Sequence, residues 1–267
     1  MDLLLLSGYA ASLFIGLSLG LIGGGGTILA VPILVYLLGV DPSNATAYSL
    51  FVVGFTAAIG AYRAHGKGSV NVRVGLLFGI PAIIAVFFTR YQLFPMIPEQ
   101  FALLDFQFEK NGAVMVLFAV LMLIASITMI RENEDAKREE VKGKTSSVLI
   151  IGEGLVVGVL TGLVGAGGGF IIIPALIFLG KLDMKTAIGT SLMIIALKSL
   201  IGFSGDVLSG RSIDWVLLAS VTALAVVGIY IGTRMSALFS SAVLQKSFGW
   251  FVLIVGSLIL FQELSFA

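Results

Sequence analysis

Two clusters of consecutive glycines are the residues whose types and spacing most directly indicate chemistry. One runs from Gly23 to Gly26, and the other runs from Gly165 to Gly169 with Ala166 inside it. Consecutive glycines break a helix and leave backbone N–H groups without partners inside it. The apolar segment after each cluster presents a helix N-terminus, whose N–H groups and dipole favour an anion. The clusters therefore predict a backbone anion site, made of Gly23, Gly24, Gly25, Gly26, Thr27, Gly165, Gly167, Gly168 and Gly169.

Polar and small residues recur at positions i, i+7 and i+11 of two other segments, a spacing that keeps them on one helix face. They are Ser49, Thr56 and Gly60 in one segment, and Ser191, Lys198 and Gly202 in the other, where Thr190 adds a further hydroxyl. We predict that this stripe lines the substrate pathway. Lys198 has two interpretations: a side chain that snorkels to the outer interface, or an intramembrane ammonium that attracts an oxyanion.

Other residues in the apolar segments have competing interpretations. A carboxylate at Glu153 would carry a coupled proton, or would be solvated if it lies close to the interface. Asp41 and Asp183 each precede a helical segment and are predicted to be N-caps. Two glycine pairs with GxxxG spacing predict close helix packing. These pairs are Gly16 with Gly20 and Gly158 with Gly162.

The composition places these groups in a membrane. The mean hydropathy is +1.09 and only 12% of the 267 residues are charged, too few to cover a soluble core. Residues 74–89, 111–130 and 216–233 carry no charge, and such runs are about long enough for a helix to cross the bilayer core. We therefore predict an all-α polytopic membrane protein in a bacterial-type inner membrane. The first segment follows Asp2 rather than a basic start, which favours a retained helix over a signal peptide.

The same composition argues against several other functions. There is no cysteine and only one histidine, which excludes disulfides and a multi-histidine metal site. The net charge of +1 gives no case for nucleic-acid binding. The segments offer almost no cluster of polar side chains for an enzyme. We expect no metal and no cofactor, with a small-molecule anion and the lipid bilayer as partners and the oligomeric state open.

An internal duplication organises the chain. Residues 16–50 align without a gap with residues 158–192 at a shift of 142, and thirteen of the 35 paired positions are identical. The identities include glycines, a proline and an aspartate rather than aliphatic residues alone, which makes duplication the sound interpretation. We predict a first transmembrane repeat at 1–130, a cytoplasmic linker at 131–146 and a second repeat at 147–267.

Each repeat divides into five apolar segments. They are 3–22, 27–40, 44–64, 72–90 and 111–130, followed by 147–165, 170–181, 184–205, 214–233 and 244–262. Because five is odd, the second repeat must be inverted relative to the first. The second segment of each repeat is short, and is either a tilted crossing or the return limb of a re-entrant hairpin.

The distribution of basic residues sets the orientation. With ten alternating segments, twelve of the sixteen lysines and arginines fall on one side, Arg90, Lys110 and Arg211 fall on the other, and Lys198 lies inside a segment. Without the short segments the division is nine against six. The positive-inside rule therefore favours ten segments, with both termini periplasmic or external and the linker in the cytoplasm.

Inverted repeats with broken helices are characteristic of secondary transporters that bind substrate near the midplane and work by alternating access. Two alternatives stay open. An anion channel would share the architecture, but its flux would neither saturate nor couple to an ion gradient. A membrane scaffold would carry no flux.

The duplicated pattern G-x-x-x-G-x-x-G-x-G-G-x(5)-P, followed by a helix with alanine and serine at Ala45 to Ser49 and Ala187 to Ser191, resembles the sulfite exporter TauE/SafE family, also called the toluene-sulfonate uptake permease family. The resemblance covers nearly the whole chain, twice over. It implies export or import of sulfite, thiosulfate, sulfoacetate or related organosulfur anions, without fixing which. The first copy departs from the second at Thr27, where the second has Gly169.

Overall fold

The computed structural model describes residues 3–103, 106–131, 147–165, 167–178, 180, 182–235 and 241–266. The predicted linker at 131–146 lies outside the described residues except for Arg131. Six helices of the described part are long and apolar enough to cross a membrane, and three further apolar helices are shorter. This confirms a polytopic helical membrane protein.

Each of the ten predicted segments coincides with a helical stretch. In the first half these are α1 (Leu3–Ile22), the broken stretch η1 (Gly23–Leu29), α2 (Ala30–Pro32) and η2 (Ile33–Leu37), then α3 (Pro42–Gly66), α4 (Val72–Phe88) continued by η3 (Thr89–Leu93) and α5 (Phe94–Met96), and α6 (Lys110–Arg131). In the second half they are α7 (Ser147–Val164), α8 (Gly169–Phe178), α9 (Met184–Leu208), α10 (Trp215–Met235) and α11 (Ser241–Phe266).

One feature was not predicted from the sequence. A short antiparallel hairpin of β1 (Gln100–Leu103) and β2 (Phe106–Glu109) joins α5 to α6, with Gln100 opposite Glu109. It belongs to the first half. The corresponding connection between α10 and α11 passes through residues 236–240, outside the described part.

The duplication extends to the helix boundaries. The ranges of α3 and α9 differ by 142 at both ends. Both begin after an aspartate whose carboxylate accepts backbone N–H groups: Asp41 from Ser43 at 3.1 Å, and Asp183 from Thr186 at 3.1 Å. The two predicted N-caps are confirmed, because each satisfies N–H groups that the first helical turn leaves free.

The two halves are interleaved rather than side by side. Helix α1 of the first half packs on α10 of the second, and α7 of the second half packs on α4 of the first. The GxxxG glycines lie at these two crossings. A Cβ on Gly20 would lie 2.6 Å from Thr233 N, and one on Gly158 would lie 2.6 Å from Ala82 O. Their predicted role in close helix packing is confirmed.

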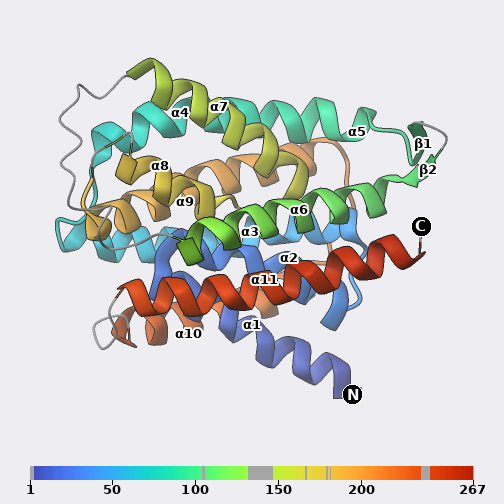
Figure 1. The fold of residues 1–267 in the computed structure, drawn as a ribbon, viewed down its shortest axis with the longest axis horizontal. Coiled ribbons are helices and arrows are strands. Elements are labelled where there is room, and N and C mark those ends of the chain that lie inside the picture. Colours follow the sequence, from blue (N-terminus) through green and yellow to red (C-terminus); the bar gives the residue numbers. More distant parts are fainter. Residues whose placement is uncertain are drawn as a thin grey trace.

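The second half is inverted relative to the first. Helices α3 and α9 run antiparallel, because Gly54 of α3 faces Leu200 while Gly60, further along, faces Leu192. In Figure 1 both chain termini and the hairpin lie at one end of the molecule, and α6 ends and α7 begins at the other. This agrees with ten alternating segments; which end faces the cytoplasm stays a prediction.

The short second segment returns toward the end from which the first segment came. A Cβ on Gly8, near the start of α1, would lie 2.5 Å from Leu38, just after η2. In the second half, α8 has 10 residues and is about 15 Å long, half of a bilayer core. Helix α8 therefore covers about half of the thickness of the bilayer core, as the limb of a re-entrant hairpin does.

Candidate functional site

The two glycine clusters contact one another in the buried interior of the protein. A Cβ on Gly24 would lie 2.6 Å from the Cα of Gly169, so only glycines permit this approach of the two backbones. The Gly169 N–H donates to Thr27 Oγ1 at 3.3 Å. Thr27 and Gly169 occupy the same position of the two repeats, so the pseudo-twofold axis of the duplication passes between them.

The chain bends at each cluster, and the bends at residues 23–26 and 165–169 are here called the first and the second glycine bend. Both require backbone conformations that favour glycine. The φ angles of Gly23, Gly165, Gly167 and Gly168 are +70°, +74°, +63° and +62°, all in the left-handed region. A Cβ on Gly167 would lie 2.8 Å from Val53 of α3 and 3.3 Å from the Cβ of Thr27. The second bend thus contacts α3 and the first bend together. Gly25 and Gly26 lie within η1, in the same turn as Thr27.

Lys198 lies against the second bend. Its side chain is 1% exposed, and its Nζ donates to Thr161 Oγ1 of α7 at 2.9 Å. A Cβ on Gly168 would lie 2.9 Å from this Nζ. The snorkelling interpretation is therefore wrong, because the ammonium points into the protein and not to the outer interface.

The ammonium of Lys198 is incompletely satisfied. A lysine ammonium has three N–H donors, and Thr161 accepts one of them. Among the described residues, no carboxylate forms an ion pair with Lys198; the ion pairs there involve Arg90, Lys110 and Arg211. A buried cation without a counter-charge is costly. The site is therefore suited to an anion.

The hydroxyl stripe divides into two groups. Ser49 and Thr56 on α3 are buried, and their hydroxyls have no hydrogen-bond partner in the described structure. Thr56 is the repeat equivalent of Lys198. Ser191, in contrast, donates to Ile188 O at 2.8 Å, and Thr190 accepts from the Asn71 N–H at 2.9 Å. Thr190 thus fixes the connection between α3 and α4, and its contacts are those of a structural residue.

Glu153 lies apart from this site. It is eight residues before Thr161 on α7, about 12 Å along the helix. Its Oε2 is buried and has no hydrogen-bond partner among the described residues. The structure does not bring Glu153 to the glycine bends, and its role as a proton carrier stays a proposal.

Sequence reasoning missed Thr161, which links Lys198 to the second bend. Its carbonyl oxygen also accepts the Gly165 N–H at 2.8 Å. The available signal was a lone hydroxyl one helical turn before the glycine cluster, where the first repeat has Leu19.

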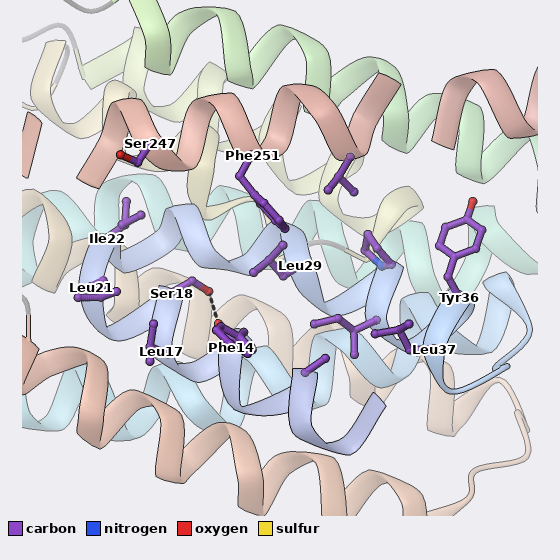
Figure 2. A pocket seen from close by; sticks show the side chains of 14 residues that line it. Phe14, Leu17, Ser18, Leu21, Ile22, Leu29, Tyr36, Leu37, Ser247 and Phe251 are labelled. Atoms are coloured by element: carbon purple, nitrogen blue, oxygen red, sulfur yellow. Dashed lines mark hydrogen bonds between the residues drawn. The ribbon is translucent and has the colours of Figure 1, made fainter. Parts of the chain in front are cut away.

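An open groove of about 680 Å³ between α1, the η1–η2 stretch and α11 is a less suitable anion site (Figure 2). Its lining is almost entirely apolar, with Phe14, Leu17, Leu29 and Phe251 among the labelled side chains. The Ser18 hydroxyl in it donates to the Phe14 carbonyl at 2.7 Å. The described residues that line the groove include no cation, so the glycine bends and Lys198 form the stronger candidate.

An inverted duplication with two broken helices that contact one another is an architecture found in many secondary transporters. The chain belongs to the sulfite exporter TauE/SafE family, whose family model matches residues 9–259. This confirms the resemblance seen in the duplicated glycine pattern.

The curated relatives agree. The chain is 30% identical over 252 residues to a protein of Xylella fastidiosa (strain 9a5c) named "Probable membrane transporter protein", covering 93% of this chain and 92% of the relative. It is 28% identical over 247 residues to "Probable membrane transporter protein YdhB" of Bacillus subtilis (strain 168), covering 92% and 96%. No solved structure gives a significant match.

Proposed function

We propose that the protein is a secondary transporter of small sulfur-containing oxyanions, such as sulfite, thiosulfate or an organosulfonate, and that the anion binds between the glycine bends and Lys198. The observation that carries the proposal is the buried Lys198 ammonium, which has a neutral hydroxyl partner at 2.9 Å and no carboxylate among the described residues. A bound oxyanion would supply the missing counter-charge.

The glycine bends supply the second requirement of such a site. A small oxyanion is recognised by backbone N–H groups that approach it closely, and left-handed glycines permit this approach. Gly167 and Gly168 both have positive φ, and Gly168 adjoins the Lys198 ammonium. The family description names sulfite, which is an oxyanion. This favours oxyanions over other anions as the substrate class.

The site lies where the two halves meet, which suits alternating access. Helices α3 and α9 pack against one another, and each carries one of the equivalent residues Thr56 and Lys198. We propose that rocking of the interleaved halves opens the site to each side in turn. In this arrangement the protein lies in a bacterial-type inner membrane with both termini external and the linker cytoplasmic, and Glu153 carries a coupled proton.

The proposal is tested by reconstituting the purified protein into liposomes with a panel of anions: sulfite, thiosulfate, sulfoacetate, sulfate and chloride. We expect saturable flux of at least one sulfur oxyanion and none of chloride. Flux that rises linearly with concentration would instead indicate a channel. Absence of flux for the whole panel in folded protein would contradict the proposed substrate class.

A further inference from the structure

A second buried cationic cluster lies at the end of the molecule that carries the hairpin. Three cations surround the buried ring of Phe94: the guanidinium carbons of Arg90 and Arg211 lie 4.9 and 5.4 Å from its centroid, and Lys110 Nζ lies 4.7 Å from it. These are the three basic residues that the charge distribution assigns to the outer side. They come from η3, the start of α6 and the turn after α9, so the fold gathers residues far apart in the sequence.

The cluster carries more buried positive than negative charge. Asp206 lies 3.4 Å from Arg90 Nη1 and 3.2 Å from Arg211 Nε, and the Arg90 and Asp206 side chains are both fully buried. Lys110 pairs with Glu99 at 3.5 Å, but the Glu99 carboxylate is 81% exposed. In the described structure a single buried carboxylate thus faces two guanidinium groups, and a buried charge in excess is costly.

One edge of the Arg90 guanidinium has no hydrogen-bond partner among the described residues. Nη1 donates to Thr46 Oγ1 at 3.0 Å and to Asp206 Oδ1 at 3.4 Å. The Nε and Nη2 atoms are buried and have no hydrogen-bond partner among the described residues. These two N–H groups form the side-on edge of the guanidinium, whose parallel donors match two oxygens of an oxyanion.

The cationic cluster adjoins the candidate site of the glycine bends and Lys198 through the second bend. A Cβ on Gly165 would lie 2.5 Å from the Cβ of Thr46, the hydroxyl partner of Arg90, so the cluster touches the second glycine bend. On the opposite side the equivalent contact is Gly23 with Ile188, 2.7 Å away, and the repeat equivalent of Arg90 is Gly232. The position equivalent to Arg90 therefore carries no cation.

We propose that the Nε–Nη2 edge of Arg90, together with Arg211, forms an outer oxyanion subsite through which the anion passes between the external solution and the Lys198 site. The inference rests on the proposed function, because the anion it binds is the transported one. Arg211, whose side chain is 15% exposed, is the more accessible of the two cations, and Arg90 lies deeper.

The test compares transport of sulfite from the two sides, in right-side-out and inverted membrane vesicles. Arg90→Lys keeps the charge and removes the fork, and Arg211→Gln removes the more accessible charge. We expect each substitution to raise the half-saturating sulfite concentration on the external side about tenfold, because about one charge-assisted hydrogen bond is lost. The half-saturating concentration on the inner side should change less than twofold. Arg63→Lys is the matched control, because Arg63 stacks 4.7 Å from the Tyr230 ring and donates to Thr233 at the opposite end.

Equal changes from both sides, or no change in inserted Arg90→Lys and Arg211→Gln proteins, would overturn the subsite. If Arg90→Lys does not insert, Arg211→Gln decides by the same criterion.

If the wild-type vesicles carry no sulfur oxyanion at all, the proposed function fails. Thermal protection of the purified protein by sulfite then decides whether the subsite exists. Protection that survives Lys198→Met and is lost in Arg211→Gln supports it; protection unaffected by Arg211→Gln overturns it.

Discussion

Replacing Gly168 with alanine probes the central site with the smallest possible side chain. The residue has a φ of +62°, and this conformation costs an L-residue about 1–2 kcal/mol. The new Cβ would also crowd Thr161 and lie 2.9 Å from Lys198 Nζ. Overpacking of this kind costs about 1–3 kcal/mol. We therefore expect the variant to lose about 2–5 kcal/mol of stability.

The effect on transport follows from the displacement of Lys198. Ordinary non-bonded contacts begin at about 3.5 Å, so the ammonium must move by roughly 0.6 to 1 Å. A misplacement of that size in a binding group costs about 100-fold in rate. Gly68→Ala is the matched control, because Gly68 has a φ of +69° but no atom within 4 Å of the Cβ position. It incurs the backbone strain alone.

The assay is the initial rate of sulfite flux per inserted protein, with the free energy of unfolding measured on the same samples. We expect Gly168→Ala to lose about 100-fold of the flux, and Gly68→Ala to keep most of it, with a stability loss limited to about 1–2 kcal/mol. If Gly168→Ala is folded and transports like the wild type, the ammonium and the bend do not form the substrate site.

The remaining predictions concern orientation and local stability. A cysteine at Lys142 in this cysteine-free chain should react with an impermeant thiol reagent only after the membrane is opened; labelling of intact cells would place the linker outside. Asp183→Ala should cost about 0.5–2 kcal/mol of stability through loss of the N-cap, as followed by chemical unfolding. The side-chain and backbone hydrogen bonds of Thr186 hold the pKa of Asp183 below its ordinary value. This cap therefore stabilises the wild type fully above the unfolded pKa of about 3.9 and is lost as the pH falls through the folded pKa. The stability difference between wild type and Asp183→Ala should shrink on acidification, and a difference independent of pH would contradict the cap's contribution.

Local signals in the sequence predicted the architecture well. The shift of 142 that pairs Asp41 with Asp183 also relates the boundaries of α3 and α9, because caps and glycines act within one or two turns of their own position. The charge-free runs predicted the membrane helices for the same reason. The contact of Thr27 with Gly169 agrees with the inversion, since equivalent residues of an inverted repeat approach one another at its axis.

The partners of the charged residues were beyond the sequence. Lys198 and Thr161 lie 37 residues apart, and Arg90 and Asp206 lie 116 apart. Both pairs depend on how α7, η3 and α9 pack, which no local pattern encodes. Thr190 shows the converse: it lies beside the predicted stripe, yet it accepts from the Asn71 N–H, because the loop after α3 folds back on α9.

The most direct test of the Lys198 site is sulfite transport by Lys198→Met and Lys198→Arg proteins, with Lys185→Met at the exposed start of α9 as the control for loss of a lysine. Because the Lys198 ammonium is buried against Gly168, we expect Lys198→Met to stop transport or to raise the half-saturating anion concentration at least tenfold. Lys198→Arg should keep part of the activity, and Lys185→Met should keep all of it. Unchanged kinetics in a correctly inserted Lys198→Met protein would remove Lys198 from the anion site.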